Sequence, residues 1–596
     1  MRSSRRSGWL TRIAAAGLAA LALTAGAATQ AAEQRIRIDI VGVDDAIADN
    51  VRGYLTLTRY AQRDDITDAQ VRRLADRAVD EAADALRPFG YYDAKVRSRT
   101  TRDDPRWIVR LRIDPGKPVL MESVQVRVTG PGADEPALAA LAPASPLRPG
   151  ARLDHAAYEN LKSSLLRTAL DLGYLDAKLT RRELLVDPPQ FTASASIELD
   201  TGGRYRFGAI TIKQDVLNEA LLQRFIRFES GDVFSNDRMR STQYALEDSN
   251  YFSEVRVTQG RRDPATLTVP VTIEADAIKR NRYTVSLGYG TDTELRGRFA
   301  WDDRRVNSRG HRWRFEMTGS AVLQEAIARY IVPVGDPALE KLEFSGGYIN
   351  EQLGDVDSER YELTSALTQT MGKWQRVLFL KLNDERSDYP DGTSNQDLLL
   401  IPGISYASMP PNFLTGWVRE SAYYVELSGS PSTLGSDVSY LRFYARGERV
   451  WSIGGPWYLR LRGELGTSWV DEFSRLPASQ RFFAGGDRSV RGFALDSLSP
   501  PAEGTQTDQN SNNGVGGEHK LVGSIEIERD LPKNLRAAVF YDTGNAFNDW
   551  GTPLEYSVGV GLRWRLPMLL IGVDVAQALS EPDRRPRLHL NITQVL

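Results

Sequence analysis

Two patterns of hydrophobic and polar residues divide the chain near residue 280. Before that point, two stretches carry apolar residues at every third or fourth position, which is the spacing of an amphipathic helix. These residues are Val71, Leu74, Ala78 and Ala82 in the first stretch and Leu161, Leu165, Ala169 and Leu172 in the second. From Arg282 onward, apolar and polar residues alternate instead, which predicts β-strands with two different faces.

A short motif repeats in the helical part of the chain. Gly90 to Val96 (GYYDAKV) recurs as Gly173 to Leu179 (GYLDAKL), and a weaker copy begins at Asn250. Each copy follows a predicted helix and leads into alternating strands, and one strand precedes each helical part. The preceding strands are expected at Ile36 to Val41, Val124 to Val128 and Phe207 to Ile212. Gly90 and Gly173 occupy the helix end, where a residue that tolerates positive φ is favoured.

Each repeat therefore predicts the order strand, helix, helix, strand, strand. About eighty residues are enough for one sheet covered by two helices. The order of elements and the Gly-Tyr-x-Asp-Ala motif resemble the polypeptide-transport-associated (POTRA) domain, three times, at 34–118, 119–202 and 203–277. The resemblance implies an α+β arm of three POTRA domains in the periplasm.

Residues 282–596 predict a 16-stranded antiparallel transmembrane β-barrel. In these strands one face is apolar with aromatic ends, and the other is small, polar or rich in arginine. Examples of the apolar face are Tyr283, Val285, Leu287 and Tyr289, and later Val558, Val560, Leu562 and Trp564. Lipid outside and water inside require this alternation, and an even number of strands closes such a barrel without a free edge.

A soluble β-sandwich also alternates and is the structural alternative. It would bury the apolar faces and leave arginines such as Arg296, Arg298 and Arg563 on its surface. The unbroken run of strands and a secretion signal at the N-terminus favour the barrel. Arg2, Arg5 and Arg6 precede the apolar run from Ile13 to Thr24, which is shorter than the ~20 residues of a spanning helix. Residues 1–32 are therefore predicted to be a cleaved signal peptide.

Composition excludes several functions. The chain has 596 residues, a net charge of −3 and no cysteine. The charge gives no reason to expect a nucleic-acid partner, and the lack of cysteine removes disulfides, thiolate zinc sites and cysteine nucleophiles. The four histidines lack metal-ligand spacing, so we expect no metal and no other cofactor.

No motif predicts an enzyme. Asp542-Thr543-Gly544 has the form of an aspartic-protease signature, but such an enzyme needs a second aspartate in a shared site. No second Asp-Thr-Gly or Asp-Ser-Gly sequence is present. Asn591-Ile592-Thr593 has the form of a glycosylation sequon but falls in a predicted barrel strand, so we assign it no modification.

The main functional motif falls in an insertion at about 467–518, between the eleventh and twelfth predicted barrel strands. An insertion of this length is either a surface loop or a segment folded into the barrel. It contains Val490, Arg491, Gly492 and Phe493. In the following strands, alternation points Ser524, Glu526, Phe540 and Asp542 inward. Two inward carboxylates on adjacent strands suit a bidentate arginine from the loop. We therefore predict a lumen clamp between Arg491, Asp542 and Glu526.

These motifs together resemble the BamA/TamA superfamily of outer-membrane insertases and two-partner secretion transporters. Val-Arg-Gly-Phe resembles its loop-six motif, Phe540-Tyr541-Asp542-Thr543-Gly544 its thirteenth-strand motif, and Gly523-Ser524-Ile525-Glu526 its twelfth-strand motif. The resemblance assigns Arg491, Gly492, Phe493, Glu526, Asp542 and Gly544 to the clamp. It covers nearly the whole chain after the signal.

Three repeats resemble the TamA branch of this superfamily. BamA-like members carry five such domains, and two-partner transporters carry two after a plug helix, for which Ile36 leaves no room. The resemblance implies an outer-membrane location in a Gram-negative bacterium, contact with outer-membrane lipid, and a TamB-like partner anchored in the inner membrane. Clients would be unfolded autotransporter-type and other outer-membrane proteins. A two-partner secretion pore for a dedicated exoprotein and a passive porin are the alternatives.

The first and last strands are predicted to meet in a lateral seam, with Arg282–Gly290 paired to Arg587–Leu596. The first strand carries small inward residues, which weaken a strand because little side-chain packing is gained. The seam residues are Ser286, Gly288 and Gly290 in the first strand and Asn591 in the last. We expect Ser286 to face a residue near Asn591 and the seam to open sideways toward an incoming strand.

Overall fold

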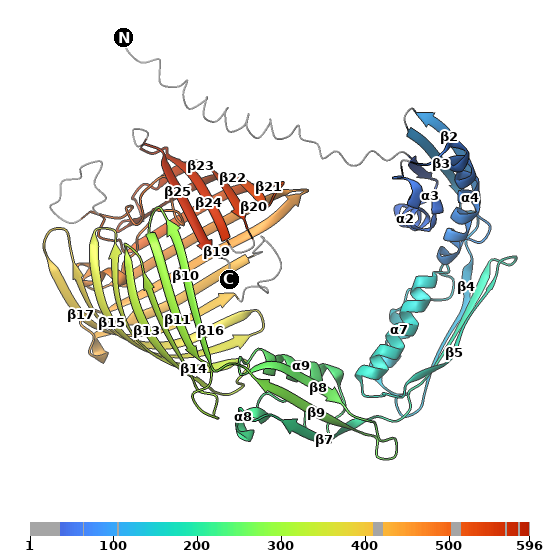
Figure 1. Cartoon of the computed structure of the whole chain (residues 1–596), viewed down its shortest axis with the longest axis horizontal. Helices are drawn as coiled ribbons and strands as arrows, with labels where there is room; N and C mark the ends of the chain where they lie inside the picture. The colour runs from blue at the N-terminus through green and yellow to red at the C-terminus, as the bar shows by residue number, and fades with distance from the viewer. Residues whose placement is uncertain are drawn as a thin grey trace, which may run out of the picture. The chain divides into compact units, whose positions relative to one another are not determined.

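The structure is a computed structural model that describes residues 36–63, 65–103, 106–408, 421–501, 514–566, 569–581 and 585–594. The predicted signal peptide at 1–32 lies outside these residues. The chain divides into two compact units (Figure 1). One holds the first two repeats and parts of the third, and the other holds the barrel together with 213–226 and 242–256. Among the described residues, no helix is both long and apolar enough to cross a membrane.

The first repeat is a three-stranded sheet with helices packed on it. It contains β1 (Ile36–Val41), α2 (Asp45–Tyr54), α3 (Thr56–Tyr60), α4 (Asp68–Leu86), η1 (Arg87–Phe89), β2 (Lys95–Asp103) and β3 (Arg106–Asp114). The order in the sheet is β1-β3-β2, with β1 parallel to β3. Thr67 and Gln70 form a capping box at the start of α4, and Val71, Ala78 and Ala82 turn into the core.

The second and third repeats have the same sheet topology, β4-β6-β5 and β7-β9-β8. The second contains β4 (Leu120–Thr129), α5 (Pro136–Ala139), α6 (Leu141–Ala144), α7 (His155–Asp171), β5 (Lys178–Asp187) and β6 (Thr192–Asp200). The third contains β7 (Arg206–Lys213), α8 (Glu219–Gln223), α9 (Asn236–Glu247), β8 (Phe252–Gln259) and β9 (Thr268–Ala277). Three small sheets therefore recur in the order that the sequence predicts.

The repeated motif ends a helix and joins one repeat to the next. Gly90, Gly173 and Asn250 all have positive φ, at +83°, +91° and +63°. The carbonyl of Gly90 accepts a hydrogen bond from the amide of Val119 at 2.8 Å, and that of Gly173 accepts one from Tyr205 at 2.8 Å. Both amides lie directly before the first strand of the following repeat. All three copies thus make a turn with positive φ, and the first two also make the same connection to the next repeat.

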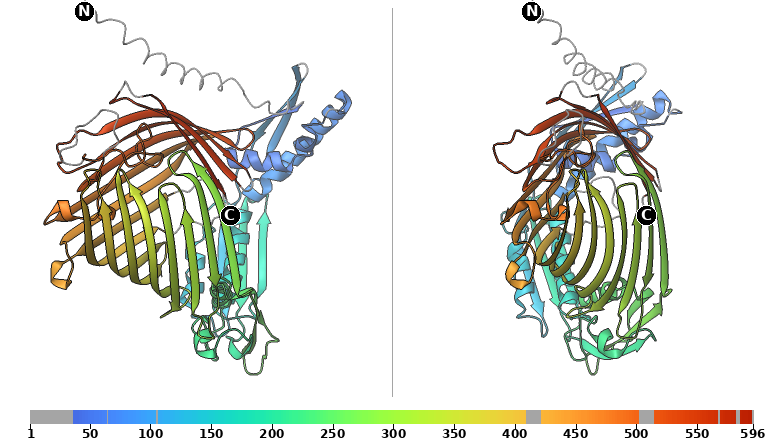
Figure 2. Two further views of the ribbon diagram at one scale, coloured as in Figure 1. Left: turned by 60° about the vertical axis from the view of Figure 1, so that its left-hand side comes forward. Right: turned by 90° about the vertical axis from the view of Figure 1, so that its left-hand side faces the viewer.

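The C-terminal part is a closed antiparallel barrel of sixteen strands, β10 to β25 (Figures 1 and 2). The strands are β10 (Asn281–Gly290), β11 (Glu294–Asp303), β12 (Arg312–Gly319), β13 (Leu323–Pro333), β14 (Glu340–Leu353), β15 (Val356–Met371), β16 (Trp374–Asp388), β17 (Ser394–Ser408), β18 (Ser421–Ser430), β19 (Tyr440–Gly454), β20 (Trp457–Val470), β21 (His519–Leu531), β22 (Leu535–Phe547), β23 (Glu555–Arg565), β24 (Leu569–Ala578) and β25 (Arg587–Gln594).

The two faces of the barrel follow the predicted alternation. In β10, Tyr283, Val285 and Leu287 are more than 60% exposed on the outer face. Inward residues in β21 and β22, including Glu526 and Asp542, are buried inside the barrel. Lipid takes the place of water around the outer face, so exposed apolar side chains are expected there.

The seam between β10 and β25 is described over part of its length. Among the described residues, Tyr289 pairs with Ile592 and Gly290 pairs with Asn591, whereas β10 pairs with β11 along ten positions. The residue that faces Ser286 is not among the described pairs, so a partner for Ser286 near Asn591 stays a prediction. The inserted loop begins later than predicted, since β20 continues to Val470 and leaves residues 471–518 between the strands. We call these residues loop six.

Candidate functional site

Loop six packs against the inner wall of the barrel. It contains the short helices η3 (Phe473–Arg475) and η4 (Ala478–Gln480). Its apolar residues form one buried cluster with inward residues of β21, β22 and β24. The cluster comprises Phe482, Ala484, Val490, Phe493 and Leu498 from the loop, with Val522, Ala546 and Ala578 from the strands. The described part of loop six is therefore held inside the barrel by apolar burial as well as by polar contacts.

Arg491 binds the two carboxylates on which the predicted clamp depends. Its Nε and Nη2 donate to the two carboxylate oxygens of Asp542, each at 2.8 Å, and its Nη1 donates to Glu526 Oε2 at 3.0 Å. The backbone amide of Arg491 also donates to Asp542, at 3.2 Å. Asp542 is fully buried and Arg491 is 2% exposed. A guanidinium is suited to binding a buried carboxylate because it donates to both carboxylate oxygens at once.

The surroundings of the clamp fix the position of Arg491. Its guanidinium carbon lies 3.2 Å from the centre of the Phe540 ring, in a cation–π arrangement. Ser524 Oγ donates to Asp542 at 2.6 Å, and His589 Nε2 lies 2.7 Å from the carbonyl oxygen of Arg491. Phe540, Ser524 and His589 come from three different strands. The charged groups are thus satisfied from several sides, as buried charges require.

Glycines allow the loop and strands to approach closely at this site. A Cβ on Gly492 would lie 2.6 Å from the Cβ of Ser557 and 2.8 Å from the amide of Ala578. A Cβ on Gly544 would lie 2.6 Å from the carbonyl oxygen of Leu521. Both contacts are shorter than a side chain can tolerate. Phe493 is fully buried in the apolar cluster, so all six predicted clamp residues lie at or beside the contact between loop six and the wall.

A second anchor holds loop six to a different part of the wall. Glu385 of β16, which is 1% exposed, accepts hydrogen bonds from the backbone amide of Ser479 and from Ser358 Oγ, both at 2.9 Å. The amide of Ala478 donates to Ser387 Oγ at 3.2 Å. The sequence analysis missed this anchor. Inward alternation in β16 could have identified Glu385 as a buried carboxylate, but not its partner in the loop.

Loop six also bridges the two edge strands of the seam. Asn591 of β25 donates from Nδ2 to Asp487 of the loop at 3.2 Å and accepts from Arg296 of β11 at 3.1 Å. The amide of Asp487 donates to Asp292, in the turn after β10, at 2.8 Å. His589 Nδ1 of β25 lies 3.5 Å from the same Asp292 carboxylate. We call Asp292, Arg296, Asp487, His589 and Asn591 the seam bridge.

The Asp292 carboxylate is held in its charged form. Burial raises its pKa, but the nearby His589 imidazole and the hydrogen bond from the amide of Asp487 outweigh burial and lower the pKa below the usual value. A charged Asp292 can accept from both neighbours. Of the predicted seam residues, Gly290 and Asn591 pair with each other, and Gly288 lies against β25, where a Cβ would be 3.0 Å from the carbonyl oxygen of Ile592.

Comparison with known proteins agrees with this architecture. Residues 420–594 match the Omp85 superfamily domain. Residues 37–115 match the first POTRA domain of TamA, and 205–276 match a POTRA domain described as a surface antigen variable number repeat.

Two similar proteins carry the name outer membrane protein assembly factor BamA. The protein from Neorickettsia risticii is 23% identical over 406 residues, covering 63% of this chain and 53% of that protein. The protein from Nitratidesulfovibrio vulgaris is 20% identical over 369 residues, covering 58% of this chain and 45% of that protein. The chain thus spans about half the length of the curated relatives it matches.

A solved structure shares the fold. The crystal structure of BamA from Haemophilus ducreyi lacking POTRA domains 1–3 superposes with a TM-score of 0.64 at 15% identity, covering 80% of this chain and 99% of that one. The domain matches, the named relatives and the closed barrel lead to one assignment. The chain carries a domain similar to the Omp85 superfamily domain at 420–594 and POTRA-like domains at 37–115 and 205–276, as an outer-membrane β-barrel protein with its N-terminal domains in the periplasm.

Proposed function

We propose that this protein assembles or translocates other outer-membrane proteins by opening its barrel sideways between β10 and β25. The observation that carries the proposal is the seam, where β10 and β25 pair at two positions among the described residues while the neighbouring β10–β11 ladder has ten pairs. Relatives named as outer membrane protein assembly factors support the same function. The proposal includes no catalytic step.

An open seam would expose unpaired backbone groups on β10. A client strand in lipid also carries unpaired amides and carbonyls, which are costly there. Pairing the client strand with the free edge would satisfy both sets of groups, as in β-strand addition. Ser286, Gly288 and Gly290 place little inward side-chain bulk along that edge. The edge can therefore accept clients of different sequence.

Loop six would control this opening. The clamp fixes the loop to β21 and β22, and the seam bridge connects the same loop to β25 and to the turn after β10. A loop that contacts both edges from inside stabilises the closed seam. Release of the Asp487–Asn591 contact would leave the two short backbone pairs as the main connection.

The periplasmic arm would present clients and bind a partner. We propose that all three repeats are POTRA domains, since the second repeat shares its sheet topology with the two that match POTRA families. The match of 37–115 to a TamA domain supports the TamA branch, with a TamB-like inner-membrane-anchored partner and autotransporter-type clients. An exposed sheet edge in such a repeat is a template for an added strand.

Reconstitution would test the assembly function. The full-length protein is inserted into liposomes, and a urea-unfolded outer-membrane barrel is added as the client. Client folding is followed by its heat-modifiable migration. We expect faster folding than in protein-free liposomes and in liposomes with an unrelated porin. Equal rates in all three would contradict the proposal. Single-channel recording distinguishes the proposed assembly function from a passive porin. A passive porin conducts steadily, whereas a barrel that holds loop six inside it does not.

A further inference from the structure

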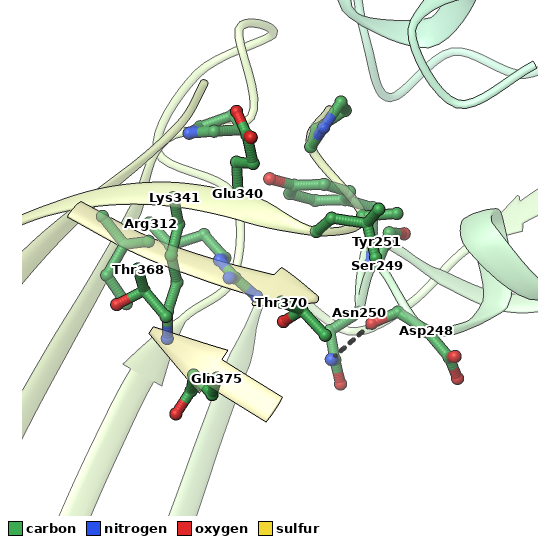
Figure 3. A pocket seen from close by; sticks show the side chains of 15 residues that line it. Asp248, Ser249, Asn250, Tyr251, Arg312, Glu340, Lys341, Thr368, Thr370 and Gln375 are labelled. Atoms are coloured by element: carbon green, nitrogen blue, oxygen red, sulfur yellow. Dashed lines mark hydrogen bonds between the residues drawn. The ribbon is translucent and has the colours of Figure 1, made fainter. Parts of the chain in front are cut away.

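A cavity of about 200 Å³ opens at the end of the barrel where β10 begins, far along the chain from the clamp motif. The barrel strands β12 to β16 contribute most of it, and Asp248 to Tyr251, which follow α9, cover one side (Figure 3). These segments all belong to one compact unit. The sequence analysis assigned no binding role to the residues of this cavity.

Two cations, Arg312 and Lys341, line this cavity. Neighbouring inward arginines are neutralised, because Arg314 lies 3.1 Å from Glu316 and Arg329 lies 3.4 Å from Glu343. Within the part of the chain that the structure describes, neither Arg312 nor Lys341 has a carboxylate within ion-pair distance, and the buried Nε of Arg312 has no hydrogen-bond partner. The guanidinium of Arg312 lies 5.8 Å from the centre of the Tyr251 ring.

The two carboxylates that border the cavity do not neutralise these cations. Glu340 accepts a hydrogen bond from Gln369 at 3.0 Å, and Figure 3 shows its carboxylate and the Lys341 amine on opposite faces of β14. The Asp248 carboxylate points away from Arg312 in the same view. Two like charges in a partly enclosed space repel each other and lose hydration, so a counter-ion between them is strongly favoured.

Neutral donors surround the cations. Thr368, which is 8% exposed, and Thr370 present hydroxyl groups from β15, and Gln375 presents an amide from β16. Cations together with hydroxyl and amide donors form the usual surroundings of a phosphate oxyanion in proteins.

We propose that the Arg312–Lys341 cavity is a binding site for a phosphate-type oxyanion. The planar guanidinium contributes paired N–H donors and the ammonium contributes a point charge, a combination that binds a tetrahedral anion well. Two sources share this chemistry: free inorganic phosphate and the phosphate of a phospholipid headgroup. Because the cavity lies at the barrel end, it is near the level of the membrane interface, where headgroup phosphates are found.

Binding is measured on the full-length protein in a phosphate-free detergent. Inorganic phosphate is titrated while its ³¹P linewidth and the thermal unfolding midpoint of the protein are recorded. We expect saturable broadening and a raised midpoint for the natural protein, and loss of both for Lys341→Met and Arg312→Gln. Lys341→Arg keeps the charge and should keep binding. Arg376→Gln removes a cation on the outer face of neighbouring β16 and should bind as the natural protein does.

A second arm identifies the source of the anion. Nanodiscs containing phosphatidylglycerol replace the detergent, and retention of anionic lipid is read by native mass spectrometry. Two results together would identify a lipid headgroup as the ligand of this site. The natural protein retains at least several-fold more anionic lipid than Lys341→Met, and it does not bind inorganic phosphate in the first experiment. If neither probe distinguishes Lys341→Met from the natural protein while both remain heat-modifiable, the proposal is overturned. Both readouts are independent of client assembly, so they can fail or succeed apart from the proposed function.

Discussion

At the scale of single residues, the clamp shows why an arginine is required inside this barrel. Asp542 and Glu526 face inward from adjacent strands, and both are almost completely buried. Each needs a counter-charge in place, because an isolated buried carboxylate is strongly destabilising. Arg491 reaches both carboxylates and stacks on Phe540 with the same group. A lysine could supply the charge but not the paired hydrogen bonds.

We predict that Arg491→Ala destabilises the packed state of loop six by about 3–5 kcal/mol, because it leaves two buried carboxylates without their partner. Arg491→Lys should have an intermediate effect. The measurement is protease cleavage within loop six on intact cells, together with the midpoint of heat-modifiable unfolding. Arg488→Ala is the matched control, because Arg488 lies three residues away and is exposed. Equal protease sensitivity for Arg491→Ala and the control would contradict the clamp.

His155 predicts a pH effect in the periplasmic arm. Its Nε2 lies 3.0 Å from the Tyr92 hydroxyl, and burial lowers the pKa of His155 below the usual value. In the unfolded chain the His155 imidazole therefore binds a proton near pH ~6.5, whereas in the folded chain it binds this proton only at a lower pH. The stability contributed by neutral His155 is fully present above that pH and is lost as pH falls.

Thermal unfolding of the full-length protein, followed by its helical circular dichroism signal, measures this effect. Between about pH 7 and about pH 5, His155→Gln should lose less stability than the natural protein. Other groups titrate in both proteins, so the difference between the two curves is the relevant quantity. Parallel curves would show that His155 does not contribute.

At the scale of elements, the seam differs from the other strand contacts of the barrel. Among the described residues, β10 pairs with β11 at ten positions and with β25 at two, so opening toward β25 breaks fewer of the described backbone pairs than opening toward β11. From inside the barrel, the seam bridge connects Asp487 of loop six to β25 and to the turn after β10, and these contacts stabilise the closed seam. Side-chain contacts of this kind can be released without unfolding a strand, whereas a long ladder cannot.

A disulfide across the seam should stop client assembly. Tyr289→Cys and Ile592→Cys lie directly opposite each other, at a spacing that suits a disulfide, and the chain has no other cysteine. Oxidation should block assembly and reduction should restore it. Val285→Cys with Phe299→Cys is the control, because these residues face each other across the ladder of β10 and β11. A cross-linked seam that still assembles clients at the natural rate would rule out lateral opening.

At the scale of the whole molecule, the arm and the barrel carry separate tasks. Each repeat has its own sheet, and the first two have separate apolar cores, although Tyr92 of the first repeat packs against the core of the second. The barrel closes on itself without any strand from the arm. Partner binding and barrel folding should therefore be separable by deletion.

Deletion of residues 34–118 should abolish co-purification of the TamB-like partner while leaving a heat-modifiable barrel. The reason is that the first repeat is the part of the arm most distant from the barrel along the chain. Co-purification from native membranes measures the effect, and Arg491→Ala serves as a comparison that alters the barrel but leaves the arm intact. Full partner recovery with the deleted protein would place the docking site in another repeat.

The sequence by itself determined the type and order of the elements and the face of each side chain. Periodicities of about 3.6 and 2 report which residues turn toward a core or a lumen, so the inward direction of Glu526 and Asp542 could be read from alternation. The repeated glycines indicated helix ends for a similar local reason, since positive φ is a property of single residues. Sixteen strands and their sequential antiparallel order followed from the same patterns.

Only the tertiary structure decided which of these faces meet. Alternation does not contain the register of β10 against β25, so it could not show that Gly290 lies opposite Asn591 or that Tyr289 lies opposite Ile592. It also could not bring Glu385 to Ser479, or Asp292 to His589, since these residues are far apart in the chain. Such contacts depend on the path of loop six inside the closed barrel, and that path is set by packing against several strands at once.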